Sequence, residues 1–366
     1  DIESVVDVLR SDFLTQGSVV PKFEHKLCEY TGAENAIAVN SCTSALHIAC
    51  LALNLGPGDI LWTSPISFVA SANCGLYCGA SVDFVDIDPN TALLSIKKLE
   101  EKLQYAKKKG KLPKIVIPVH FGGQPCDMKE IYALSKKYNF KIIEDAAHAI
   151  GAKYQDKLIG SCQYSDITVF SFHPVKIITT GEGGVAMTNN LQLSDRMRLL
   201  RSHGITRDVS KMKNKPDGAW YYEQIDLGFN YRMTDIQAAL GISQLNRIEQ
   251  YVSRRNEIAE WYNKKFRTTD ISPLMQKMGR SSAYHLYVIL IKGGRQQRDV
   301  LYNYLLKNDI GVNLHYIPVY KHPFFNKNSC LENAEYYYKH AISLPIYPTI
   351  SSKDLNKVVD KILCYI

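Results

Sequence analysis

Long apolar runs are missing from this 366-residue sequence. A membrane-spanning helix needs about 18 or more consecutive apolar residues, and no stretch approaches that length. The first residues also lack the pattern of a signal peptide, although Asp1 is not an initiator methionine. Because the composition is otherwise ordinary, with 46% hydrophobic and 22% charged residues, we expect a soluble globular protein of the cytoplasm that binds no membrane.

Paired cysteine spacing is also missing. The nine cysteines are scattered, and Cys74 and Cys78 stand at a helical interval with no histidine partners nearby in the sequence. This pattern argues against both a zinc site and a disulfide framework. The sequence therefore predicts reduced thiols and no bound metal.

Two further motifs are absent. A nicotinamide-dependent oxidoreductase needs Gly-x-Gly-x-x-Gly after its first strand, where this chain has Asn40-Ser-Cys-Thr-Ser44. The basic run Lys107-Lys-Lys-Gly-Lys111 has no interleaved aromatic residues on which bases could stack, so no nucleic-acid partner is expected. The net charge of +8 instead suits an anionic ligand such as a nucleotide diphosphate.

Short apolar runs alternate with helical patterns along the first two thirds of the chain. Seven of them have the length of buried strands: 36–39, 60–63, 82–87, 115–119, 141–144, 167–172 and 185–188. Strands that alternate with helices predict βα units, and hence an α/β fold around a mostly parallel seven-stranded sheet. Two local helix starts are also predicted, a capping-box-like start at Asp127 and a helix containing Phe68.

The pattern changes after Thr234, which opens a capped helix. Helical periodicity continues through Ile248, Ile258 and Trp261 with a bend or break. We place the domain boundary within this segment, between a large domain (1–245) and a small α+β domain (246–366). The small domain is predicted to contain strands at 285–291 and 311–316 and helices at 298–307, 332–339 and 352–363.

Polar side chains gather where two of the buried strands end. Asp145 follows one strand, and Ser171 and Lys176 follow another, just before the glycine-rich turn Thr180-Gly-Glu-Gly-Gly184. A desolvated lysine loses proton affinity and becomes a nucleophile near neutral pH, which suits an imine with a carbonyl cofactor. Pyridoxal 5′-phosphate needs such a lysine, a carboxylate for its ring nitrogen and donors for its phosphate. All three are available at this edge of the sheet.

Each residue type also has a plainer interpretation. Lys176 could instead be an ordinary surface lysine. Asp145 could instead cap a helix, or bind a metal together with His148, although the further ligands that a metal site needs are missing. Thr43 and Ser44 are otherwise ordinary caps of an apolar helix, although a helix N-terminus also binds anions. In the same way Ser171 is a buried serine bonded to its own strand, Phe68 a core aromatic, His148 a core histidine and Asn230 a loop residue suited to left-handed backbone.

Several blocks together resemble the DegT/StrS family of sugar-nucleotide aminotransferases. They are Glu144-Asp-Ala-Ala-His148, Ser171-Phe-His-Pro-Val-Lys176, the turn 180–184, and residues 40–46, 63–71, 201–204 and 228–237. The resemblance covers nearly the whole chain. It implies fold type I of pyridoxal-phosphate enzymes and a homodimer whose active sites are shared between subunits.

The resemblance also implies roles for individual residues. Lys176 holds the cofactor covalently and acts as general base and acid, and Asp145 pairs with the pyridine nitrogen. The remaining cofactor contacts are Thr43, Ser44 and Ser171 at the phosphate, Phe68 and His148 beside the ring, and Asn230 at the neighbouring subunit's phosphate. Glu182, Arg232, His315 and Tyr316 are candidate substrate residues.

Within the family, residues 171–184 most resemble the transaminases that make UDP-4-amino-4,6-dideoxy-N-acetyl-β-L-altrosamine for pseudaminic acid synthesis. The implied reaction moves the amino group of L-glutamate to C4 of a UDP-linked 4-keto-6-deoxy-HexNAc sugar. Reactions of the GDP-perosamine or UDP-arabinose type stay open, as does a relative that binds ligand without turnover. A sugar dehydratase of the same fold resembles this family with histidine in place of Lys176.

Overall fold

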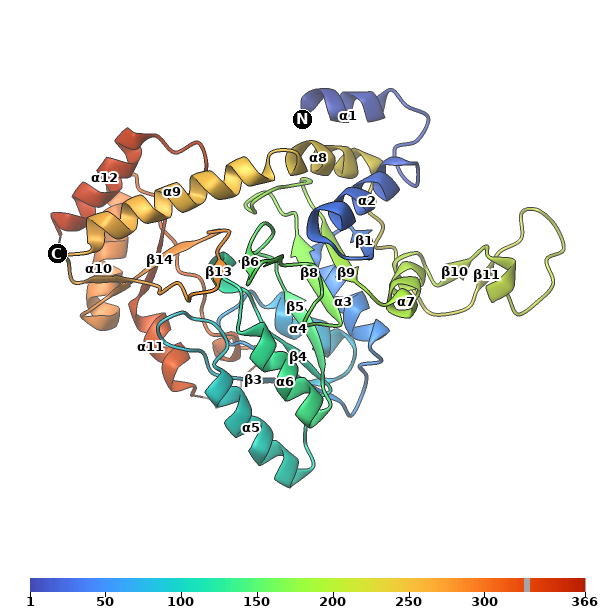
Figure 1. Ribbon diagram of the computed structural model, residues 1–366, viewed down its shortest axis with the longest axis horizontal. Coiled ribbons are helices and arrows are strands. Elements are labelled where there is room, and N and C mark those ends of the chain that lie inside the picture. The colour runs from blue at the N-terminus through green and yellow to red at the C-terminus, as the bar shows by residue number, and fades with distance from the viewer. Residues whose placement is uncertain (326–329, 366) are drawn as a thin grey trace.

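The computed structural model describes residues 1–325 and 330–365, and a seven-stranded sheet forms its centre (Figure 1). The strand order is β1-β9-β8-β5-β4-β2-β3. The bounds are β1 Asn35–Val39, β2 Ile60–Thr63, β3 Ser81–Phe84, β4 Ile115–Ile117, β5 Lys141–Asp145, β8 Ile167–Ser171 and β9 Gly184–Thr188. Four neighbouring pairs are parallel, and β9 alone runs antiparallel to its neighbours β1 and β8. The predicted seven strands and mostly parallel sheet are therefore confirmed.

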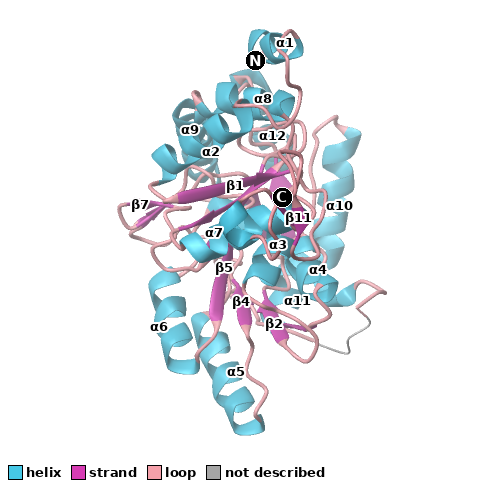
Figure 2. Ribbon diagram, turned by 90° about the vertical axis from the view of Figure 1, so that its right-hand side faces the viewer, coloured by secondary structure: helices cyan, strands magenta, loops and turns pink. Residues whose placement is uncertain are grey.

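Both faces of this sheet are buried by helices, which explains why its strands are continuously apolar. Ile37 and Ile143 pack with α3 (Cys42–Ala52), α4 (Ala70–Tyr77) and α7 (Leu191–Arg201). The alternate residues Ala38 and Ile142 face α2 (Val19–Thr31), α5 (Ile96–Lys109) and α6 (Met128–Tyr138). Figure 2 shows α5 and α6 on the opposite side of β4 and β5 from α3 and α4. The chain therefore folds as a three-layer α/β structure with the strand ends left free for chemistry.

A long helical segment leads out of this layer structure. Helix α8 (Asp235–Leu245) begins with the predicted capping box between Thr234 and Gln237. It is followed, after a break at Asn246 and Arg247, by α9 (Ile248–Phe266). Beyond the break lies a separate apolar cluster drawn wholly from residues after position 257. The domain boundary at 245/246 stays a prediction, and the break in the helix lies where that prediction puts it.

The C-terminal part combines a small antiparallel sheet with helices. Its strands are β12 Ile271–Pro273, β14 Tyr287–Ile291 and β15 Ala341–Leu344, and its helices are α10 Gly294–Lys307, α11 Glu332–His340 and α12 Ser352–Leu363. The predicted strand at 311–316 is wrong. Only Asn313 forms a bridge, with Ser343, before the chain turns away and carries Tyr316 toward the large domain.

Two local helix predictions also need correction. Helix α6 begins after Asp127 as expected, but the Asp127 carboxylate does not cap it; the carboxylate instead forms ion pairs with Lys277 and Arg280, at 2.6 and 2.8 Å. Phe68 is not helical, because α4 begins only at Ala70. At Asp127 an ion pair with a distant segment replaces the expected cap. At Phe68 the chain follows a loop where the local pattern predicts a helix.

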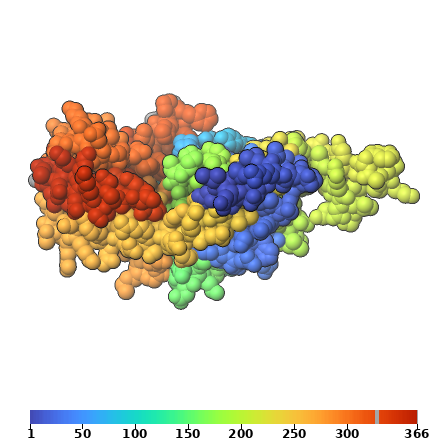
Figure 3. Space-filling model, turned by 90° about the horizontal axis from the view of Figure 1, so that it is seen from above, coloured from blue at the N-terminus to red at the C-terminus, as the bar shows by residue number. Residues whose placement is uncertain are grey.

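The remaining elements lie around the edges. Helix α1 (Ile2–Leu9) packs on α8, and β6 (Lys153–Tyr154), β7 (Lys157–Leu158) and β13 (Arg280–Ser281) form a small sheet. Strands β10 (Ile205–Thr206) and β11 (Glu223–Gln224) pair at the base of an arm. Figure 3 shows this arm extending at the opposite end of the molecule from the C-terminal helices. In the described ranges, no helix combines the length and apolarity needed to cross a bilayer.

Candidate active site

A cavity of about 660 Å³ opens at the carboxyl ends of β5 and β8. Parallel strands bring their C-terminal residues to one edge of a sheet, which is where α/β proteins bind ligands. The predicted site residues that line this cavity are Thr43, Ser44, Phe68, Asp145, His148, Ser171, Lys176, Glu182 and Tyr316. The fold thus gathers residues that span more than 270 positions of the sequence, from Thr43 to Tyr316.

Lys176 lies in the turn after β8, and its side chain reaches into the cavity. Its ε-amine has no hydrogen-bond or ion-pair partner among the described residues. Burial lowers the pKa of this amine, and the nearby Cys42 and Asp145 oppose part of that effect. The result is an amine with more of its neutral, nucleophilic form at neutral pH than a surface lysine has.

Asp145 ends β5 and is 5% exposed. One carboxylate oxygen, Oδ2, accepts a hydrogen bond of 2.5 Å from the Ser71 hydroxyl. The other, Oδ1, accepts one of 3.1 Å from the Ala147 amide. A buried carboxylate needs hydrogen-bond donors in place of water, and these two donors hold the side chain at the cavity wall.

The N-terminus of α3 offers a site for an anion. Ser41 caps the helix by accepting from the Ser44 amide, while in the part of the chain that is described the amides of Cys42 and Thr43 have no acceptor. Free amides at a helix N-terminus bind phosphate well. The Ser171 hydroxyl accepts from the His173 amide and keeps its own proton to donate. The Ser44 hydroxyl, by contrast, already donates to Asn40 at 2.7 Å.

Gly184 is what allows this helix end to approach the sheet. A Cβ at Gly184 would lie 2.5 Å from the Cys42 amide nitrogen and 2.6 Å from the Ser41 carbonyl. No side chain fits there without moving the start of α3. The glycine-rich turn therefore has a specific structural purpose at its last residue.

His148 and Tyr316 line the cavity together, although 168 positions separate them in the chain. The Gly122 amide donates to His148 Nδ1 at 3.3 Å, so the neutral ring carries its proton on Nε2, 3.2 Å from the Tyr316 oxygen. Burial, aided by the charge of Lys176 and by His315, holds the pKa of His148 well below its usual range. His148 is thus a neutral donor to Tyr316, whose own O–H is left for a ligand. Phe68 lies at the mouth, 59% exposed, with its ring 6.5 Å from that of Tyr316.

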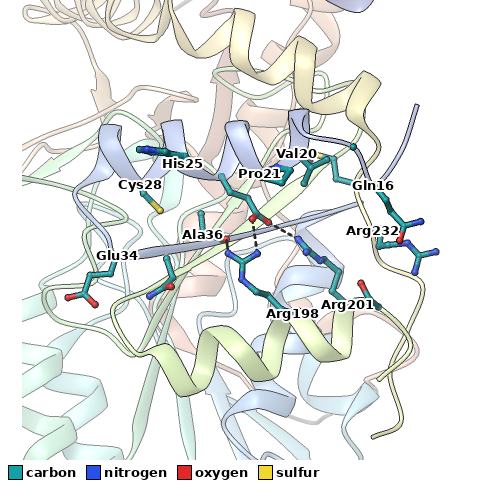
Figure 4. A pocket seen from close by; sticks show the side chains of 15 residues that line it. Gln16, Val20, Pro21, His25, Cys28, Glu34, Ala36, Arg198, Arg201 and Arg232 are labelled. Atoms are coloured by element: carbon teal, nitrogen blue, oxygen red, sulfur yellow. Dashed lines mark hydrogen bonds and ion pairs between the residues drawn. The ribbon is translucent and has the colours of Figure 1, made fainter. Parts of the chain in front are cut away.

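Three predicted residues are not brought to this cavity. Asn230 is exposed beside Ser202. His315 bonds to the Ser343 hydroxyl at 2.8 Å, and burial with the charge of Lys176 lowers its pKa to about 4. Arg232 lines a second cavity of about 720 Å³ at the edge of the sheet, shown in Figure 4, where Glu24 is already paired with Arg198 and Arg201.

Two residues that matter at the site carry no role in the sequence analysis. Ser67 lines the cavity, and Ser71 bonds Asp145 from 74 positions away. Both lie in the block 63–71 that contributes to the family resemblance, which is the only signal the sequence offers for them. Cys42 also lines the cavity, beside Lys176.

The model of the DegT/DnrJ/EryC1/StrS aminotransferase family matches residues 1–363. The chain belongs to this family. A UDP-4-amino-4,6-dideoxy-N-acetyl-β-L-altrosamine transaminase from Campylobacter jejuni is 40% identical over 365 residues, which is 98% of this chain and 93% of the relative. The match extends over almost the entire length of both proteins.

Solved structures agree with this assignment. PseC of Helicobacter pylori, an aminotransferase involved in the biosynthesis of pseudoaminic acid, superposes with a TM-score of 0.89 at 31% identity, covering 100% of this chain and 95% of that one. The sugar aminotransferase Spr1654 of Streptococcus pneumoniae, solved in PLP and PMP forms, gives TM-scores of 0.89 and 0.90 at 28% identity, covering 100% of this chain and 95% and 96% of the two. The protein is therefore a pyridoxal-phosphate-dependent sugar aminotransferase of fold type I.

The cavity fits this cofactor. Its unpaired amine, its hydrogen-bonded carboxylate and its free helix amides match the aldehyde, ring nitrogen and phosphate of pyridoxal 5′-phosphate. The presence of Lys176 also argues against the dehydratase relatives that resemble the family with histidine at this position.

Proposed function

We propose that this aminotransferase moves the amino group of L-glutamate to C4 of a UDP-linked 4-keto-6-deoxy-HexNAc sugar. The product is a UDP-4-amino-4,6-dideoxy sugar for glycans of the pseudaminic acid type. The observation that carries this proposal is the 40% identity, over 98% of the chain, to the Campylobacter jejuni transaminase named for such a product.

The chain's own residues have distinct tasks in this proposal. When bound, the cofactor supplies an electron sink for the carbon that loses its proton. The Lys176 amine would hold the cofactor until the amino donor displaces it. The freed amine would then move a proton from Cα of glutamate to the cofactor and, in the second half-reaction, from the cofactor to C4 of the sugar. The Asp145 carboxylate would pair with the protonated ring nitrogen, and the free α3 amides with the hydroxyl groups of Thr43 and Ser171 would hold the phosphate. Ser44 would join them by exchanging its hydrogen bond to Asn40 for one to the phosphate.

Other residues shape the pocket around these groups. Phe68 and His148 bracket the ring, and Tyr316 with Glu182 contacts the sugar. Tyr316 enters from the C-terminal domain, and burial together with the charge of Asp145 raises the pKa of its phenol, so it acts as a neutral donor. Glu182 faces His173 across 3.9 Å at the mouth of the cavity.

The proposal includes a homodimer in the cytoplasm. Asn230 and Arg232 lie outside the cavity of their own subunit. In the proposed dimer Asn230 would serve the cofactor phosphate of the partner copy, and Arg232 would contact substrate. His315 contacts substrate once the sugar is bound. The nine free thiols suit a reducing compartment.

The test is to supply purified protein and glutamate with a panel of 4-keto sugars linked to UDP, GDP or dTDP. We expect amination of the UDP-linked 4-keto-6-deoxy-HexNAc with the highest kcat/KM, measured by the mass of the product, and none with Lys176→Ala protein. Preferred amination of a GDP-linked hexose would instead establish a perosamine-type reaction. Preferred amination of a UDP-linked 4-keto pentose would establish an arabinose-type reaction.

A further inference from the structure

We infer that Ser71, supported by Ser67, is a positioning residue that holds the Asp145 carboxylate aimed at the cofactor ring. This inference rests on the proposed function, because it takes Asp145 as the partner of the ring nitrogen. It adds a chain of hydroxyl groups behind that carboxylate.

The side chains of Ser67, Ser71 and Asp145 form a relay of two short hydrogen bonds that is buried from water. The Ser71 hydroxyl lies 2.5 Å from Asp145 Oδ2, and the Ser67 hydroxyl lies 2.7 Å from that of Ser71. Exposure is 1% for Ser71, 4% for Ser67 and 5% for Asp145, so bulk water cannot take over the hydrogen bonds. The carbonyl of Phe68 is the other acceptor near Ser71, but at 3.4 Å it is much more distant than the carboxylate.

The direction of the hydrogen bonds follows from the number of protons. An ionised carboxylate only accepts, so Ser71 must donate its single proton to Asp145. Ser67 must then donate to the lone pair of Ser71. Each donor polarises the next, and the relay ends on the carboxylate, so the two hydroxyl groups hold that side chain in place through a charge-assisted hydrogen bond.

The position of the relay also fixes the aim of the carboxylate. Ser71 lies in the first turn of α4 and holds Oδ2, while the Ala147 amide holds Oδ1 from the chain that follows β5. With both oxygens held from different elements, rotation about the bond to the carboxylate is prevented. Lys176, Cys42 and Tyr316 are the other titratable groups close enough to interact electrostatically with the carboxylate.

The experiment is a double-mutant cycle with Ser71→Ala and Asp145→Asn. For Ser71→Ala we expect the dissociation constant of pyridoxal 5′-phosphate from the reconstituted protein to rise, and kcat to fall, each by about tenfold or more, with little change in KM for the sugar. In the Asp145→Asn protein, Ser71→Ala should cause little further loss, because its effect acts through that carboxylate.

Three variants separate positioning from packing. Ser71→Thr keeps the hydroxyl and should restore cofactor affinity, and Ser71→Cys, close in volume but a poor donor, should not. Ser71→Cys also replaces Ser71→Ala in the cycle if the alanine protein does not fold. Ser135→Ala, which removes a buried hydroxyl from α6 far from the cavity, should behave like the parent protein.

The outcomes are distinct. Additive losses from Ser71→Ala and Asp145→Asn, or normal cofactor binding in Ser71→Ala while Asp145→Asn is impaired, would overturn the inference and leave the proposed function intact. Normal cofactor binding and turnover in Asp145→Asn would remove the proposed role of Asp145 itself, and the relay with it.

Discussion

At the scale of single residues, the reactivity of Lys176 follows from what surrounds it. The amine lies in a cavity wall where burial disfavours its charged form and no acceptor in the described ranges holds it. Asp145 limits the effect by favouring the ammonium ion. The reactivity of Lys176 therefore depends on Asp145, a residue 31 positions earlier in the chain.

One consequence concerns pH. Only the neutral amine attacks an aldehyde, so covalent capture of pyridoxal 5′-phosphate by the apoprotein should speed up as pH rises through the pKa of Lys176 and then level off. Because burial lowers that pKa, half-maximal capture should occur below the value for an ordinary lysine, about 10.4. The measurement is the rate of adduct formation, trapped with borohydride and followed by mass. A midpoint equal to that of lysine acetylated on its α-amino group, which keeps a free ε-amine, would contradict this prediction.

A second residue-scale prediction concerns removal of the amine. Lys176→Ala should lower kcat for amination by at least about 100-fold, the usual share of a positioned acid-base group, and should abolish the borohydride-stable adduct. Lys157→Ala, at an exposed lysine, is the matched control and should retain both. Turnover at the parent rate in Lys176→Ala would overturn the assignment of the amine.

At the scale of elements, the approach of α3 to β9 is set by one glycine. Gly184→Ala places a methyl group 2.5 Å from the Cys42 amide, so the start of α3 must move. We expect the affinity for pyridoxal 5′-phosphate to fall about tenfold or more, because the phosphate loses correctly placed amides. Equilibrium titration of the apoprotein measures this. Gly56→Ala, which meets no atom within 4 Å, should bind as the parent does.

Side chains from helices α2 and α7 cover the edge of the sheet at strand β1. Strand β1 lies at one edge of the sheet. Arg198 donates to the Ala36 carbonyl (Figure 4). Glu24 accepts from the Ala38 amide, and Arg201 donates to the Ala38 carbonyl. These side chains occupy the backbone groups that a foreign strand would otherwise pair with. Glu24, Arg198 and Arg201 also line the second cavity, where the two guanidinium groups pair with the buried Glu24 carboxylate.

This arrangement predicts a large stability effect at Glu24. Its carboxylate is buried and holds two guanidinium groups at 2.7 Å, so Glu24→Ala leaves both without their partner. We expect a loss of about 3 kcal/mol in the free energy of unfolding in urea. Glu29→Ala, on the exposed side of the same helix, should change it by less than about 0.5 kcal/mol. Equal effects at the two positions would refute the proposed protection.

At the scale of the whole molecule, the shared active site of the proposed dimer gives a complementation test. Lys176→Ala and Asn230→Ala subunits should each be poorly active alone. If Asn230 serves the partner's site, a mixed dimer contains one site with both residues intact, so refolding an equal mixture should recover about one quarter of the parent activity. No recovery, with mixed dimers verified by mass, would show that each subunit works by itself.

The sequence by itself determined the seven strands of the large sheet, the α/β class and the position of Asp145 and Lys176 after two of those strands. These features follow from the spacing of apolar residues and from short motifs, because both depend on residues that are close together in the chain and lie in the same helix, strand or turn. The predicted strand at 311–316 failed because pairing depends on a partner strand, which sequence periodicity does not reveal.

Only the tertiary structure decided which groups meet. It brought Ser71 to Asp145 across 74 positions and Tyr316 to His148 across 168, and it sent Arg232 to a different cavity from Lys176. Such contacts depend on how helices and loops pack on both faces of the sheet. Their partners are distant in the chain, so no local pattern of residues specifies them.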